Sequence, residues 1–162
     1  MNNKQYAQTG RLMFIIAWLM LFVLLFVFFY SYNESEQGSY QVEHGTITIT
    51  PDAEGHYRID GYINDYPVKF LVDTGASLVA ISQNLAAQLG LQGRYVIRLQ
   101  TAGGEVTGSL TRLQKLSFGR FTLNNIKAVI IAGGKEDEVL LGMNVLSQFN
   151  LSQQDKRLMI KK

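Results

Sequence analysis

The sequence predicts a mainly β domain over residues 45–162, preceded by one apolar helix. In the C-terminal part, apolar residues come in short alternating runs, which are typical of half-buried strands. Residues 12–30, in contrast, form one unbroken apolar run without charge or proline. A length of 162 residues allows one domain with an appendage, which fits this division.

The composition excludes several classes of site. The chain has no cysteine, which rules out a disulfide framework, a thiol nucleophile, an iron–sulfur cluster and a cysteine zinc site. Two histidines, His44 and His56, are too few for a three-histidine metal site. A net charge of +2 with scattered basic residues gives no sign of nucleic-acid binding. We therefore expect no metal, no cofactor and no nucleic-acid partner.

The apolar run at residues 12–30 has the length of a membrane span. As a helix it would rise about 28 Å, close to the hydrocarbon thickness of a bilayer. A cleaved signal peptide is the alternative, but its apolar region should be shorter and end at a small-x-small site. The residues that follow, Ser31–Glu34, make a poor cleavage site. We expect an uncleaved transmembrane helix that anchors the chain in the lipid bilayer.

The basic residues around this run predict its orientation. Lys4 and Arg11 precede it, and the next basic residue is Arg58. Under the positive-inside rule, residues 1–11 form a cytoplasmic tail and the domain lies outside the cytoplasm, in the periplasm if the source is Gram-negative. Residues 31–44 are polar and carry a glycine, which is typical of a linker.

The strands are expected in the following order. Thr46–Thr50 alternates with period two, and Tyr57–Ile63 and Val68–Val72 flank an Asn64-Asp65 turn as a hairpin would. Further strands are expected over 78–82, 94–100, 106–118 and 121–131.

Two short helices complete the expected elements. The first spans Gln83–Leu89, with Ser82 as its N-cap and Gly90 as its stop. The second and shorter one spans Asn144–Phe149.

One segment carries the chemistry. An apolar strand, Phe70-Leu71-Val72, leads directly into Asp73-Thr74-Gly75-Ala76-Ser77. A carboxylate at the mouth of a buried strand is costly unless it is hydrogen-bonded or shares a proton. Gly75 would permit close approach of backbone, and Thr74 and Ser77 offer hydroxyls. The alternative is a plain turn, because the tripeptide alone is common by chance.

A second motif favours a functional loop over a plain turn. Leu140-Leu141-Gly142 follows far downstream, inside the apolar segment 139–146. Together these motifs make residues 45–162 resemble the retropepsin-like aspartic peptidases, and most of all their bacterial membrane-anchored members with a single Asp-Thr-Gly. The resemblance implies a closed β-barrel with one or two short helices. It also implies that Asp73 is catalytic, that Thr74, Gly75, Ala76 and Ser77 support the loop, and that Leu140, Leu141 and Gly142 pack beside it.

A third element fits the resemblance less closely. Ala102, Gly103 and Gly104 separate two expected strands, where the family carries a flap that closes over substrate. Bacterial members often have Thr-Ala-Asn-Gly here, whereas this chain has Gly103 in place of Asn. A plain hairpin turn is the alternative.

The resemblance implies an aspartic endopeptidase that acts on polypeptides as a homodimer. The C-terminal residues 157–160 would be a strand available for the dimer interface, or else an edge strand of the monomer. Two other functions stay open: a non-catalytic peptide-binding module of the same fold, and an accessory subunit of a membrane complex.

The remaining candidates are weaker. Asp60-Gly61 is interpreted as a turn, and His56 as a solvated side chain. The acidic run 136–138 could hold a cation, but a solvated loop is the simpler interpretation.

Overall fold

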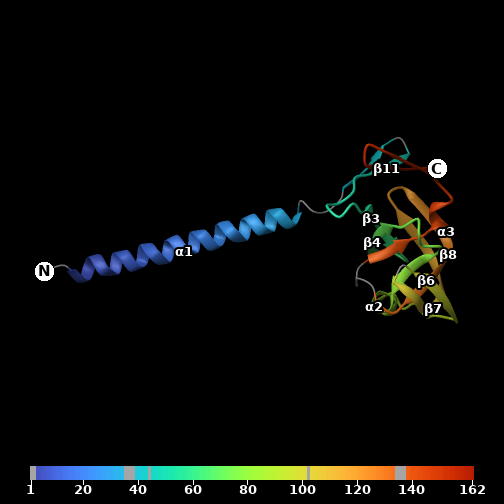
Figure 1. Ribbon diagram of the computed structural model, residues 1–162, viewed down its shortest axis with the longest axis horizontal. Coiled ribbons are helices and arrows are strands. Elements are labelled where there is room, and N and C mark those ends of the chain that lie inside the picture. The colour runs from blue at the N-terminus through green and yellow to red at the C-terminus, as the bar shows by residue number, and fades with distance from the viewer. Residues whose placement is uncertain (1–2, 35–38, 44, 102, 134–137) are drawn as a thin grey trace. The chain divides into compact units, whose positions relative to one another are not determined.

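The computed structural model describes residues 3–34, 39–43, 45–101, 103–133 and 138–162. It divides into two units, Met1–Gln37 and Gly38–Lys162. The first unit holds helix α1 (Asn3–Glu34), and the second holds the strands and the two short helices (Figure 1).

Helix α1 contains the apolar run and continues beyond it at both ends. Its large apolar side chains between residues 13 and 29 are all exposed. Among the residues described, no helix is both long enough and apolar enough to cross a membrane. The expected membrane span over residues 12–30, and with it the bilayer as a partner, is therefore not supported.

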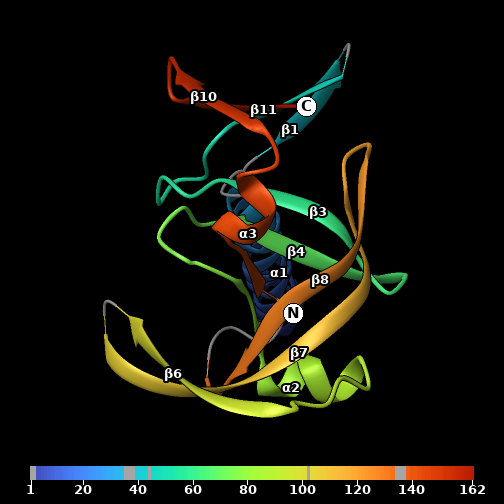
Figure 2. The same cartoon turned by 90° about the vertical axis from the view of Figure 1, so that its right-hand side faces the viewer.

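The second unit is built around a seven-stranded sheet that closes on itself. Strand β3 hydrogen-bonds to β4 on one side and to the end of β7 on the other, which closes the barrel (Figure 2). This confirms the expected barrel. The strand order is β3 (Arg58–Ile63), β4 (Tyr66–Val72), β9 (Glu138–Leu141), β5 (Val79–Ser82), β8 (Phe121–Ile131), β7 (Gly104–Phe118) and β6 (Tyr95–Thr101).

Turn and cap residues act as the sequence predicts. Asn64 and Asp65 have φ of 48° and 68°, as a two-residue hairpin turn requires. Helix α2 (Gln83–Gln88) begins after Ser82, whose hydroxyl oxygen accepts a hydrogen bond from the Leu85 N–H at 3.2 Å.

The second short helix differs from its expected position. Helix α3 is Met143–Leu146, whereas residues 144–149 were expected. It begins at Met143 because Gly142 already takes the cap position: its carbonyl accepts hydrogen bonds from the N–H groups of Val145 and Leu146.

A separate four-stranded sheet has the order β1 (Tyr40–Glu43), β2 (Thr46–Ile49), β11 (Arg157–Lys161) and β10 (Asn150–Gln154). Strand β1 lies inside the segment that we expected to be a linker. Strand β11 pairs with β2 and β10 inside one chain, so it is not an edge strand. The interpretation of residues 157–160 as an edge strand was wrong, because β10, which was not predicted, supplies the second neighbour. A part for these residues in a dimer interface stays a prediction.

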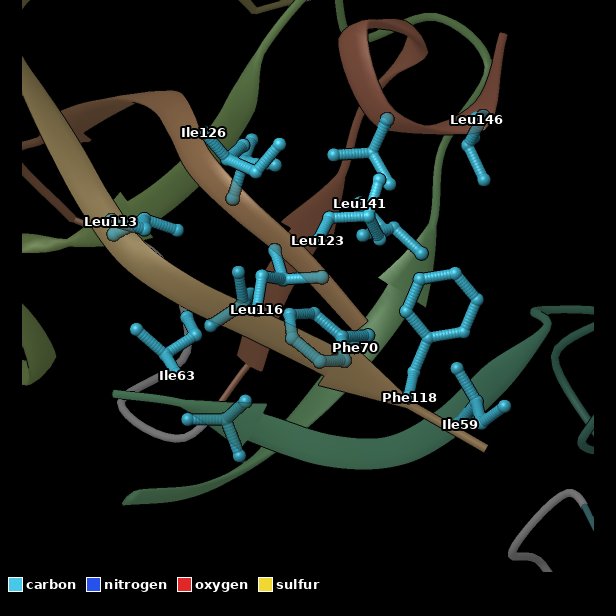
Figure 3. Packing of buried hydrophobic residues seen from close by; sticks show 14 of the residues in the cluster. Ile59, Ile63, Phe70, Leu113, Leu116, Phe118, Leu123, Ile126, Leu141 and Leu146 are labelled. Atoms are coloured by element: carbon cyan, nitrogen blue, oxygen red, sulfur yellow. The ribbon is translucent and has the colours of Figure 1, made fainter. Parts of the chain in front are cut away.

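The two sheets share one hydrophobic core. Figure 3 shows Phe70 and Phe118 among aliphatic side chains from β3, β7, β8, β9 and α3. The ring centroids of Phe70 and Phe118 lie 6.3 Å apart, edge to face. Ile47 and Ile160 of the four-stranded sheet belong to the same buried cluster.

Barrel closure depends on Gly61. This residue pairs with Val68 in β4 and with Phe118 in β7. A Cβ added here would lie 2.2 Å from the Ser117 carbonyl oxygen and 2.6 Å from the Phe70 ring. A side chain at this position would therefore push β3 away from β7.

We expect Gly61→Ala to lower the free energy of unfolding of the full chain by about 1–3 kcal/mol, the usual cost of overpacking. Urea denaturation measures it. Gly103→Ala is the control, because a Cβ added there meets a neighbour, the Thr101 hydroxyl, at 3.8 Å. Equal midpoints for the two variants would contradict this role of Gly61.

Candidate active site

Parallel pairing brings the two sequence motifs to one edge of the barrel. Strands β4 and β9 are parallel, with Phe70 opposite Val139 and Val72 opposite Leu141. Because parallel strands end at the same edge of a sheet, the residues that follow each strand meet there. The ladder continues into the loop, where the Asp73 N–H donates to the Leu141 carbonyl at 3.2 Å.

The loop after Asp73 rests on the residues after Leu141. The Met143 N–H donates to the Ala76 carbonyl at 2.7 Å, and the Asn144 N–H donates to the Ser77 carbonyl at 3.1 Å. Gly142, which precedes Met143, is buried, and a Cβ added to it would lie 2.4 Å from the Leu78 carbonyl oxygen. The motif needs glycine here because the loop backbone occupies the space of a side chain.

The carboxyl group of Asp73 is held by its own loop. Its Oδ1 accepts a hydrogen bond from the Gly75 N–H at 2.8 Å, and the Asp73 carbonyl accepts one from the Ala76 N–H at 3.3 Å. Asp73 is half-buried, whereas Thr74 and Gly75 are exposed. The loop therefore presents one oriented carboxylate at an open face of the chain.

The expected flap is a hairpin. Strands β6 and β7 are antiparallel, with Tyr95 opposite Leu110 at one end of the ladder and Thr101 opposite Gly104 at the other. The Thr101 hydroxyl donates to the Gly104 carbonyl at 2.7 Å. Gly103 lies in the turn, and Gly104 has a φ of +112°, a conformation that favours glycine. Ala102 lies outside the described residues. The hairpin is confirmed, and its role over a substrate stays a prediction.

Sequence reasoning gave no role to Asn144. Its side-chain Oδ1 accepts a hydrogen bond from the Val79 N–H at 3.0 Å, and its Nδ2 donates to the Lys127 carbonyl at 2.8 Å. The available signal was the polar amide in an otherwise apolar run, two residues after the motif glycine.

Several acidic residues and His56 lie around the guanidinium group of Arg58. Asp52, Glu54 and His56 lie close enough to share an ion. However, the guanidinium group of Arg58 pairs with Asp52 and donates from Nε to Glu138 at 2.7 Å. Glu138 therefore serves an ion pair, while Glu136 and Asp137 of the expected cation site lie outside the described residues.

A surface pocket of about 370 Å³ lies against the β3–β4 hairpin. Tyr40, Tyr62 and Asp60 are among its lining residues, and Asp73 is not. Burial raises the pKa of Tyr40, and the charge of Asp60 adds to the shift.

Comparisons with known proteins point to one family. A family model described as "gag-polyprotein putative aspartyl protease" matches residues 59–148, more than half of the chain. This range includes Asp73, Gly142 and Asn144.

Individual relatives agree with this match. A retropepsin-like aspartic protease of Rickettsia conorii is 30% identical with a TM-score of 0.63, over 76% of this chain and 94% of that one. The EIAV protease, solved with the inhibitor HBY-793, shows the same fold at 22% identity and a TM-score of 0.51, over 61% of this chain and 92% of that one.

Two curated relatives are described as uncharacterized. One, from Sinorhizobium sp., is named for the cobV 5' region and is 32% identical over 67% of this chain. The other, RP867 of Rickettsia prowazekii, is 34% identical over 75% of this chain. The chain spans about half the length of each, 53%.

We expect Gly142→Ala to destabilise the full chain by about 1–3 kcal/mol, because the added Cβ would lie within 3 Å of two loop carbonyls, those of Leu78 and Ala76. Thermal or urea unfolding measures it. Ser147→Ala, at an exposed position just after α3, is the control and should stay within about 0.5 kcal/mol of wild type. A wild-type midpoint for Gly142→Ala would show that the loop does not rest on this glycine.

Proposed function

The chain belongs to the family of gag-polyprotein aspartyl proteases, and on that basis we propose that it is an aspartic endopeptidase whose active form is a homodimer. The observation that carries the proposal is the Asp73 loop. It is hydrogen-bonded onto residues 141–144 and presents one half-buried carboxylate at an exposed face.

The need for a second copy follows from the chemistry. Activation of water in this class uses two carboxylates that share one proton, because like charges so close cannot both ionise. The sequence contains one Asp-Thr-Gly. A two-fold axis beside Asp73 would bring the same residue of a second chain to the required place. Thr74, Gly75 and Met143 are exposed beside it and offer a face that a second copy would cover.

The two carboxylates would then take different roles. The ionised Asp73 acts as general base and removes a proton from the attacking water. The protonated Asp73 of the other chain donates a hydrogen bond to the peptide carbonyl and later supplies a proton to the leaving nitrogen. Water adds to the carbonyl carbon, the C–N bond breaks, and the protein forms no covalent bond to substrate.

The substrate would be an extended polypeptide. A peptide in this conformation pairs its backbone with strand edges and places alternate side chains in pockets. The β6–β7 hairpin, whose tip carries Gly103 and Gly104, would cover it and exclude water during the reaction.

The location of the domain outside the cytoplasm stays a prediction from Lys4 and Arg11. A reporter enzyme fused after Lys162 tests it, since the prediction requires activity only outside the cytoplasm.

We expect Asp73→Asn to abolish cleavage of an unfolded protein by the full chain, because the amide can neither accept the proton from water nor return one. The variant should keep the unfolding midpoint of the wild type, since an amide oxygen can still accept from the Gly75 N–H. The control is Asp65→Asn, at the exposed β3–β4 turn, which should leave the cleavage rate unchanged.

The same variant tests the dimer. Adding an excess of Asp73→Asn chains to wild-type chains should inhibit the wild type, because mixed dimers carry one carboxylate. Equal cleavage by Asp73→Asn and wild type would refute the proposed chemistry, and wild-type rates indifferent to the added variant would refute the shared site.

The rate of cleavage should pass through a maximum at acidic to mildly acidic pH. One carboxylate of the pair must be ionised and the other protonated, so activity is lost when both are protonated at low pH and when both are ionised at high pH. A profile of kcat/KM against pH measures this. A rate that still rises at pH 9 is incompatible with a shared proton.

A further inference from the structure

The side chain of Asn144 bridges two strands at the base of the Asp73 loop. We propose that Asn144 is a positioning residue, which fixes the loop through Val79 and so sets where the Asp73 carboxylate lies. This inference rests on the proposed function for its effect on rate, but its structural part can be measured without activity.

The side-chain amide of Asn144 links the backbones of β5 and β8 where their ladder begins, as a backbone peptide group would. Strands β5 and β8 are parallel and pair from Val79 opposite Ala128 onward. At the start of this ladder, Asn144 accepts from the Val79 N–H and donates to the carbonyl of Lys127, the residue before Ala128. A side chain with one acceptor and one donor on a planar group is needed for this, which an amide supplies.

This bridge fixes the far end of the loop. Asp73 is held at the near end by the Leu141 carbonyl, and Ser77 is held by the backbone N–H of Asn144 itself. Val79 is fully buried, so its N–H has no water to replace a lost acceptor. Without the amide, the loop would keep its backbone hydrogen bonds to Leu141 and Asn144 but lose the bond that holds Val79.

The effect on catalysis follows from the geometry that two carboxylates require. They must lie close enough to share a proton and a water, and a displacement of about 1 Å can cost about 10²-fold in rate. Substrate binding under the hairpin does not use this bridge. Loss of the bridge should therefore lower kcat and leave KM nearly unchanged.

Two substitutions separate the acceptor from the donor. Asn144→Leu removes both. Asn144→Asp keeps an acceptor for the Val79 N–H but turns the second oxygen toward the Lys127 carbonyl, where two acceptors repel when the carboxylate is ionised. Once protonated, that carboxyl can donate to Lys127 and restore the bridge. Asn124→Asp, on the exposed face of β8, is the matched control for the change of charge.

The experiment compares kcat and KM of the full chain, purified in non-ionic detergent, at pH 4 and pH 7. For Asn144→Asp we expect kcat about 10²-fold below wild type at pH 7, recovering to within a few-fold at pH 4. Asn144→Leu should stay low at both values, and Asn124→Asp should follow wild type. A general loss of stability would lower Asn144→Asp and Asn144→Leu alike and would not recover in acid.

Hydrogen exchange of the Val79 amide, followed by NMR, decides the structural part whatever the activity. We expect exchange at least 10-fold faster in Asn144→Leu, and near wild type in Asn144→Asp at pH 4. Unchanged protection of Val79 in Asn144→Leu would overturn the proposal, as would a wild-type kcat in both variants. If the wild type cleaves nothing, the proposed function fails, and the Val79 amide alone decides whether Asn144 holds the loop.

Discussion

The site depends on one set of hydrogen bonds, those between the Asp73 loop and residues 141–144. They exist because β4 and β9 run parallel. The segments that follow these two strands therefore leave the barrel at the same edge and continue to pair through the loop. Gly142 permits the two backbones to approach each other, and the Asn144 side chain accepts a hydrogen bond from the Val79 N–H after the loop. The apolar residues before each motif pack the two strands into the core, and this packing fixes the position of Asp73 at the end of β4.

Under the proposed function, a single chain would supply only one of the two carboxylates. The Asp73 loop is hydrogen-bonded to residues 141–144, whereas Thr74 and Gly75 at its tip are exposed. A second copy would add the missing carboxylate and cover this face. Both backbone edges of β11 are paired within the chain, with β2 and β10. The edge strands of the four-stranded sheet are β1 and β10, so a second copy that extended this sheet would pair with one of them.

The sequence predicted every barrel strand except β9, and also the Asn64-Asp65 turn and the Ser82 cap, because each has a local signal: alternation, a turn pair or a capping hydroxyl. The segment of β9 was identified only as part of an apolar motif, because so short an apolar run does not distinguish a strand from a helix. It missed β1 and β10, which are short, polar and mostly exposed, so no hydrophobic period marks them. Asp155 and Lys156, both with positive φ, form the turn between β10 and β11 and were the clue available. For Asn144, the polar amide in an apolar run was a signal that the residue matters, but its partners Val79 and Lys127 could not be predicted because they are distant in sequence.

The central claim is that two Asp73 side chains make one active site. The most direct test is the stoichiometry of a peptide-like inhibitor that carries a hydroxyl group in place of the scissile carbonyl and mimics the tetrahedral intermediate. Titration calorimetry and native mass spectrometry on the full chain measure it. The account predicts one inhibitor molecule per two chains, with no binding to Asp73→Asn. Saturation at one inhibitor per chain, in a species that stays monomeric, would contradict it.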